Sequence, residues 1–83
     1  MKNQEVNVTK IENDIAKYSK IIEKNPSKHQ AYDLKGRALM QINRLEESLE
    51  CYNEAIKLES GNKIYLAQRA KLYGLTGQAD KAF

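Results

Sequence analysis

Carboxylates are the side chains of this 83-residue sequence whose spacing comes nearest to a catalytic or metal-binding pattern. Glu46, Glu50 and Glu54 recur every four residues and therefore share one face of a helix, with Glu47 beside them. Paired carboxylates can act as a general acid and base or bind a hard cation. The sequence indicates no buried setting for them and places no histidine nearby. We therefore predict a solvated helix face, with no catalytic residue and no metal site.

The one histidine and the one cysteine give little support to an enzyme. His29 follows a predicted helix cap, has no second histidine with which to bind a metal, and is expected at the surface. Cys51 cannot form a disulfide within the chain and adjoins the predicted core residue Tyr52, which favours a half-buried, unreactive thiol. Because no glycine-rich phosphate loop is present either, we predict a non-enzymatic protein without cofactors.

Basic and aromatic residues leave nucleic-acid binding open as an alternative function. Lysine and arginine number 14 against 11 acidic residues, a net charge of +3, which is too small and dispersed to indicate nucleic acid by itself. Four of the five tyrosines occupy periodic core positions, which leaves Tyr65 as the freer candidate for stacking on bases. The alternative prediction is a weak basic nucleic-acid or ribonucleoprotein accessory protein.

The apolar residues repeat at helical spacing, and no stretch alternates as a strand would. The pattern predicts helices over 9–24, 28–42, 45–58 and 62–76, a fifth beginning near Gln78, and a disordered segment over 1–8. Thr9 and Ser27 open capping-box sequences, and Asn43 suits a left-handed turn residue. The short predicted loops make neighbouring helices antiparallel. No apolar run is long enough to span a membrane and no secretory signal is evident, so a cytoplasmic protein is expected.

An internal repeat of 34 residues relates the two halves of the helical region. At this offset aromatic or large apolar residues match one another, small residues match small ones, and turn residues match turn residues. The pairs are Tyr18–Tyr52, Ile22–Ile56, Leu39–Tyr73, Gly36–Ala70 and Asn43–Gly77.

Residues 29–62 are similar to a tetratricopeptide repeat, a helix–turn–helix unit of this length. The residues that carry the resemblance are Tyr32, Gly36, Leu39 and Asn43 in the first helix and its turn, and Ser48, Tyr52 and Ala55 in the second. We predict a single domain over 9–83: a partial repeat or cap helix (9–28), a full repeat (29–62) and a truncated repeat (63–83). The resemblance implies an all-α, right-handed stack of antiparallel helix pairs, a fragment of an α-solenoid that serves as a non-catalytic scaffold for protein–protein interaction.

In this family the first helices of successive pairs line a concave groove that binds peptides or proteins. The residues that the resemblance places there, as a partner-binding site, are Gln30, Asp33, Leu34, Arg37, Gln41, Gln68 and Lys71. Their neutral or basic character favours an acidic or extended peptide. Asp33 stands where a carboxylate-binding clamp of the family needs a cation, which argues against that clamp. A plain solvated inner face is the other interpretation.

The truncated repeat predicts a second binding surface, because only residues 78–83 follow the last predicted full helix. Large apolar side chains left uncovered by a following helix favour self-association, as a homo-oligomer or by exchange of end helices. The predicted surface comprises Leu66, Leu72, Tyr73, Leu75 and Phe83. The other possibility is that the short tail covers them. The sequence does not name the partner or tell whether the chain is part of a longer repeat array.

Overall fold

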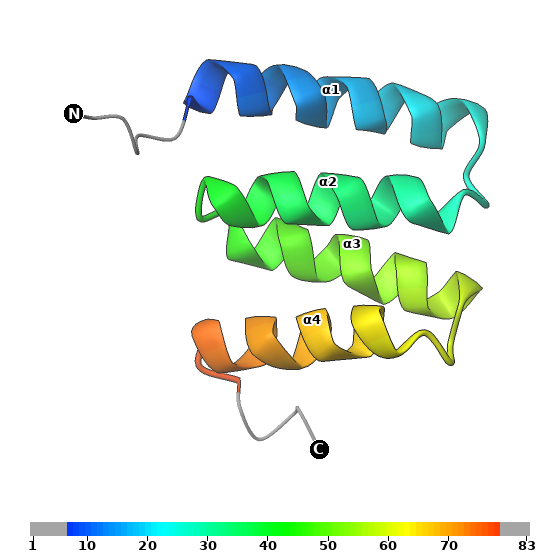
Figure 1. The fold of residues 1–83 in the computed structure, drawn as a ribbon, viewed down its shortest axis with the longest axis vertical. Coiled ribbons are helices and arrows are strands. Elements are labelled where there is room, and N and C mark those ends of the chain that lie inside the picture. Colours follow the sequence, from blue (N-terminus) through cyan, green and yellow to red (C-terminus); the bar gives the residue numbers. More distant parts are fainter. Residues whose placement is uncertain (1–6, 79–83) are drawn as a thin grey trace.

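The computed structural model describes residues 7–78, which form four α-helices connected by short turns (Figure 1). The helices are α1 (Val8–Lys24), α2 (His29–Gln41), α3 (Leu45–Leu58) and α4 (Lys63–Leu75). Residues 7–78 contain no strand, and the predicted all-α fold is confirmed. The predicted fifth helix beyond Gln78, like Phe83, lies outside the described residues.

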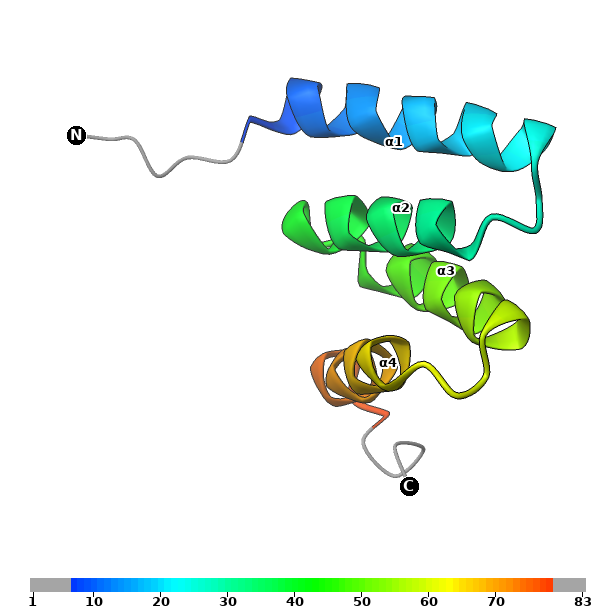
Figure 2. The same ribbon diagram turned by 45° about the vertical axis from the view of Figure 1, so that its right-hand side comes forward.

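Each helix packs antiparallel to the one before it, so α1 contacts α2, α2 contacts α3, and α3 contacts α4 (Figures 1 and 2). The body is flattened, with extents of 40 × 33 × 17 Å. A stack this thin leaves one side of every helix near solvent, and the core is limited to the contacts between neighbours. None of the helices in the described part of the chain is long and apolar enough to cross a membrane.

The period of 34 residues recurs in the backbone. Helix α4 has the bounds of α2 moved by 34 positions, from 29–41 to 63–75. Both helices end in a turn with one left-handed residue, Asn43 with φ 62° and Gly77 with φ 78°. In each turn the next amide donates to the carbonyl five residues earlier, Arg44 to Leu39 at 2.9 Å and Gln78 to Tyr73 at 2.6 Å. The predicted role of Asn43 is therefore confirmed.

The predicted helix caps are wrong at two positions. Helix α1 begins at Val8 because Asn7, which is as good a cap as Thr9, accepts a hydrogen bond from the Lys10 amide at 3.0 Å. The structure thus places residues 7 and 8, which we assigned to a disordered segment, in the cap and first turn of α1. Helix α2 is preceded by Lys28 without a side-chain cap, because Ser27 lies in the turn before it.

Two apolar clusters meet on α2 and α3 and make up the core. One cluster joins α3 to α4 and includes Tyr52 and Leu72, both fully buried. The other joins α1 to α2 and α3 and includes Ile15 and Leu39. Tyr32 is half-buried and packs against both clusters. The pair α2–α3 is therefore the centre of the fold, and it positions the surfaces on either side of it.

Candidate functional site

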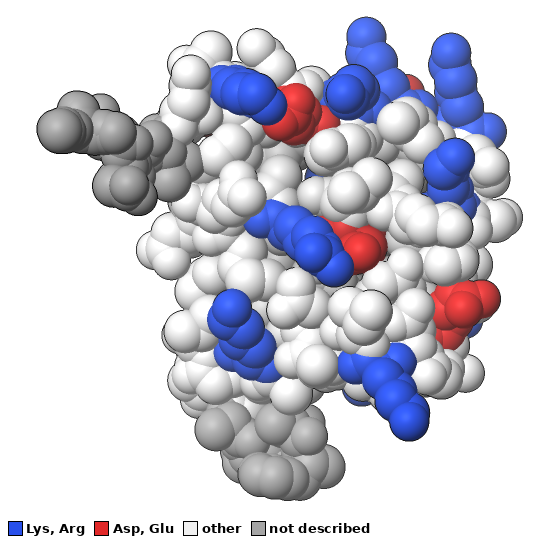
Figure 3. Space-filling model, viewed as in Figure 1, with Lys and Arg blue, Asp and Glu red and all other residues white. Residues whose placement is uncertain are grey.

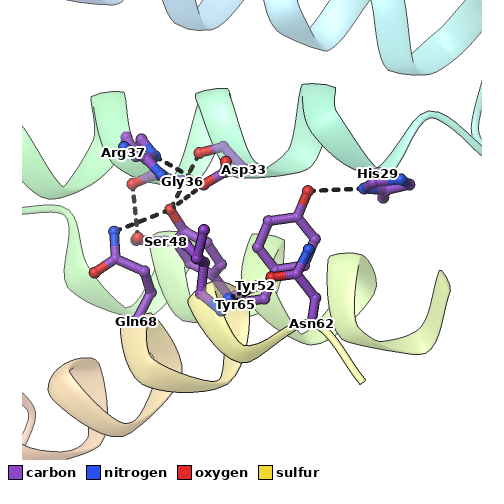
Figure 4. A network of polar contacts seen from close by, with 10 residues as sticks. His29, Asp33, Gly36, Arg37, Ser48, Tyr52, Asn62, Tyr65 and Gln68 are labelled. Carbon is purple, nitrogen blue, oxygen red and sulfur yellow. Dashed lines mark hydrogen bonds and ion pairs between the residues drawn. The ribbon is translucent and has the colours of Figure 1, made fainter. Parts of the chain in front are cut away.

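The α2–α3 pair is fixed by a close contact between a glycine and a tyrosine. A Cβ atom added to Gly36 would lie 2.6 Å from Cε2 of Tyr52, so only glycine allows this ring to pack against α2. The Ser48 hydroxyl, fully buried beside them, donates to the Gly36 carbonyl at 2.7 Å. This contact directs the Tyr52 hydroxyl between α2 and α4 (Figure 4).

The Tyr52 hydroxyl organises a polar network that joins three helices (Figure 4). It donates to Oδ1 of Asp33 at 2.6 Å, and the same oxygen accepts from Nε of Arg37 at 2.9 Å. Nε2 of Gln68 on α4 lies 3.4 Å from the Tyr52 oxygen and donates to it. Burial, together with the hydrogen bond to Asp33, raises the pKa of Tyr52, so its hydroxyl remains a donor at neutral pH. The hydrogen bond to Asp33 also raises the pKa of Arg37.

A groove of about 340 Å³ lies beside this network, between α2 and α4. Its lining residues are Arg37, Met40, Gln41, Asn43, Leu45, Gln68, Lys71 and Leu75. Four of the seven predicted partner-binding residues come together here: Arg37, Gln41, Gln68 and Lys71. Gln30 and Leu34 are exposed on α2 but do not line the groove. Asp33 is half-buried and holds Arg37 in place.

The groove lining is basic, because it carries two cations, Arg37 and Lys71, and no carboxylate. Three amide side chains and three apolar ones make up the rest. The space-filling view shows more basic than acidic side chains on the face that it presents, and some of the basic ones lie directly beside an acidic one (Figure 3). This composition offers hydrogen bonds, apolar contact and positive charge within one concave surface.

Tyr65 is not a free aromatic residue, and that prediction is wrong. It extends from α4 and is buried in the α3–α4 core, where its hydroxyl lies 2.7 Å from Nδ1 of His29 and its ring packs on Tyr52. Nε2 of His29, which we expected at the surface, also lies 3.8 Å from a carboxylate oxygen of Glu59. At the 34-residue offset Tyr65 corresponds to Ala31, which is buried too, so both repeats bury this position. Tyr65 is therefore not available to stack on nucleic-acid bases, which removes the main support for that alternative function.

The predicted self-association surface needs one correction. Leu72 is fully buried in the α3–α4 core, since it lies on the same side of α4 as Tyr65, and it cannot contribute to an exposed surface. Tyr73 is half-buried and packs against that core. Leu66 and Leu75 remain 37% and 55% exposed, and Leu75 also lines the groove.

Among residues 7–78, two of the glutamates noted in the sequence are paired with basic side chains and the cysteine is buried. Both Glu47 oxygens accept from Arg44, at 2.6 and 2.7 Å, and Glu54 pairs with Lys57. Cys51 is buried, which raises the pKa of its thiol to about 11, so the thiol is protonated and a poor nucleophile at neutral pH. Between residues 7 and 78, no three histidine, cysteine or carboxylate side chains are grouped as metal ligands.

The fold defines a class before any comparison: helical-repeat proteins built from stacked antiparallel hairpins. The family model of the tetratricopeptide repeat matches residues 29–62, which hold α2 and α3. The chain therefore contains a tetratricopeptide repeat. Proteins of this kind generally mediate protein–protein interaction and are generally not catalytic. No solved structure matches the chain.

Proposed function

We propose that the chain is a scaffold module that binds an acidic, extended segment of a partner protein in the groove between α2 and α4. The observation that carries the proposal is the lining of this groove, which holds Arg37 and Lys71 without any carboxylate. A negatively charged segment would be attracted to it and a positively charged one repelled.

Arg37 is prepared for such a ligand by its neighbours. Nε of Arg37 donates a hydrogen bond to Asp33, so the two terminal nitrogens of the guanidinium are left to bind a carboxylate of the partner. Asp33 is itself held by Tyr52, so both act as positioning residues. An arginine fixed in this way loses less side-chain freedom on binding than a free one.

The other lining residues complete the proposed contact. Gln41 and Gln68 can hydrogen-bond the peptide backbone, while Met40, Leu45 and Leu75 offer an apolar surface to a side chain of the partner. Gln30 and Leu34, exposed on α2 outside the lining, would touch only a longer segment.

Reversing the charge of Lys71 is expected to weaken binding of acidic peptides by at least about tenfold, because an attractive contact becomes a repulsive one. Fluorescence anisotropy with end-blocked decapeptides of aspartate, glutamate and leucine measures this effect for Lys71→Glu. Lys63→Glu is the matched control, since Lys63 lies exposed on the same helix and does not line the groove. Equal losses from both variants, or equal binding of lysine–leucine decapeptides, would contradict the proposal.

We also infer self-association through one side of α4, where Leu66 and Tyr73, seven residues apart, keep exposed apolar surface. Leu75, nine residues from Leu66, lies on the opposite side of the helix and lines the groove instead. Covering a large apolar side chain contributes up to about 1.5–3 kcal/mol, so a second copy of the chain could gain by packing there. Leu72 is withdrawn from the proposed set, and Phe83 lies outside the described residues.

Sedimentation equilibrium at about 100 µM is expected to give a mass above that of one chain, and Leu66→Glu is expected to restore the monomer mass. Leu58→Glu on α3 is the matched control, because Leu58 is exposed to a similar extent, 40% against 37%. A wild-type mass equal to one chain, or the same response from both variants, would rule out this surface.

A further inference from the structure

A second recess lies on the other side of α2 from the groove, enclosed by α1, α2 and α3. Its volume is about 190 Å³, room for one long side chain. Lys35 and Leu39 line it, whereas Arg37 and Gln41 line the groove. Successive helical residues are about 100° apart, so these two pairs point to opposite sides of α2. The recess is therefore separate from the proposed peptide site.

The recess has an apolar floor and an acidic rim. The floor is made by Ile22, Tyr32, Leu39 and Cys51, and the rim by Glu47, Glu50, Glu54 and Lys35. Leu39 and Cys51 are buried, and the side chains of the floor are well suited to hold the aliphatic part of a ligand. The lining holds three carboxylates and one ammonium group, and two of the carboxylates are paired with Arg44 and Lys57 next to the recess.

Glu50 is the rim carboxylate that is left for a ligand. Glu47 already receives two hydrogen bonds from Arg44, and Glu54 receives one from Lys57 at 3.1 Å. Glu50 lies between them on the same face of α3 and makes no ion pair or side-chain hydrogen bond within residues 7–78. A cation bound at this rim could therefore pair with Glu50, which lies between the already paired Glu47 and Glu54.

We propose that this recess binds an arginine side chain of a second partner protein. The methylene stem would lie on the apolar floor, and the guanidinium would take both oxygens of Glu50. Arginine fits better than lysine, because its planar fork matches a carboxylate in two parallel hydrogen bonds and it is more weakly hydrated. With the groove on one side and this recess on the other, the module can hold two partners at once, an acidic one and a basic one.

The test uses the full 83-residue chain labelled with ¹⁵N and the end-blocked peptide acetyl-Gly-Leu-Arg-Leu-Gly-amide. Nuclear magnetic resonance is suitable because one recess gives weak binding, which this method detects. Amide shifts are expected at Glu50, Cys51 and Leu39, with a smaller effect when lysine replaces the arginine of the peptide and none when glutamate does. Because the site is distinct from the groove, Lys71→Glu is expected to leave these shifts unchanged, which separates the two proposals.

Glu50→Gln is expected to weaken binding of the arginine peptide by about tenfold, the loss of one charge-assisted contact. Glu46→Gln is the matched control: it removes the same charge from the same helix, one turn away and outside the recess. Equal loss from both variants would show attraction to α3 as a whole and overturn the proposal. Absence of binding, shifts centred on the groove, or equal binding of the glutamate peptide would overturn it as well.

Discussion

The Tyr52→Ala variant is expected to lose about 3–5 kcal/mol of unfolding free energy, the cost of deleting a large aromatic side chain from a packed core. Tyr52 is fully buried and contacts α2 and α4 from its place on α3. A domain of this size has only about 4–12 kcal/mol of stability in total. Urea denaturation followed by circular dichroism is therefore expected to show a much lower midpoint, and a partly unfolded chain in water if the wild-type stability lies at the lower end of this range.

Tyr52→Phe is the control for this loss, because it keeps the ring and removes only the hydroxyl. The expected loss is about 1.5–3 kcal/mol, the worth of one hydrogen bond to a charged group, with the fold retained. The same variant frees Asp33 from its partner, and binding of acidic peptides is expected to weaken while the fold is intact. A loss below about 1 kcal/mol in Tyr52→Ala would contradict the central place of this ring in the core.

Substituting valine for Gly36 is expected to cost at least about 2 kcal/mol, because the new side chain has no space. A Cβ atom alone would lie 2.6 Å from Cε2 and 3.0 Å from Cδ2 of the Tyr52 ring, which is itself enclosed on all sides. Either the ring or helix α2 must move, and both are held by the Ser48 hydrogen bond and the α3–α4 core. The thermal midpoint is expected to fall by several degrees at least.

Gly74→Val provides the matched comparison in α4. Gly74 is also a helical glycine, but a Cβ atom added to it would meet no atom within 4 Å, so the change is expected to stay within about 0.5 kcal/mol. Similar losses from the two substitutions would show that the contact with Tyr52 does not decide the effect at Gly36.

The groove could be predicted in part from the sequence. The 34-residue period places Arg37, Gln41, Gln68 and Lys71 on corresponding helices, and the structure brings these four together. The same period pairs Gln41 with Leu75, which also lines the groove although we assigned it to another surface, but it does not reveal the contribution of Leu45 from the start of α3. Leu45 reaches the groove through the turn after α2, whose position depends on how the helices cross.

The helices and their period follow from the sequence because they rest on local interactions: apolar residues at helical spacing, and turn residues such as Asn43 and Gly77 that accept a left-handed backbone. Burial of Tyr65 and Leu72, and the engagement of Asp33 by Tyr52, were decided only by the tertiary structure. Each of these depends on a neighbouring helix that contacts the residue from a distant part of the chain. Helical periodicity tells which residues share a face of a helix. The packing of the helices determines which faces are in contact and which polar atoms form hydrogen bonds.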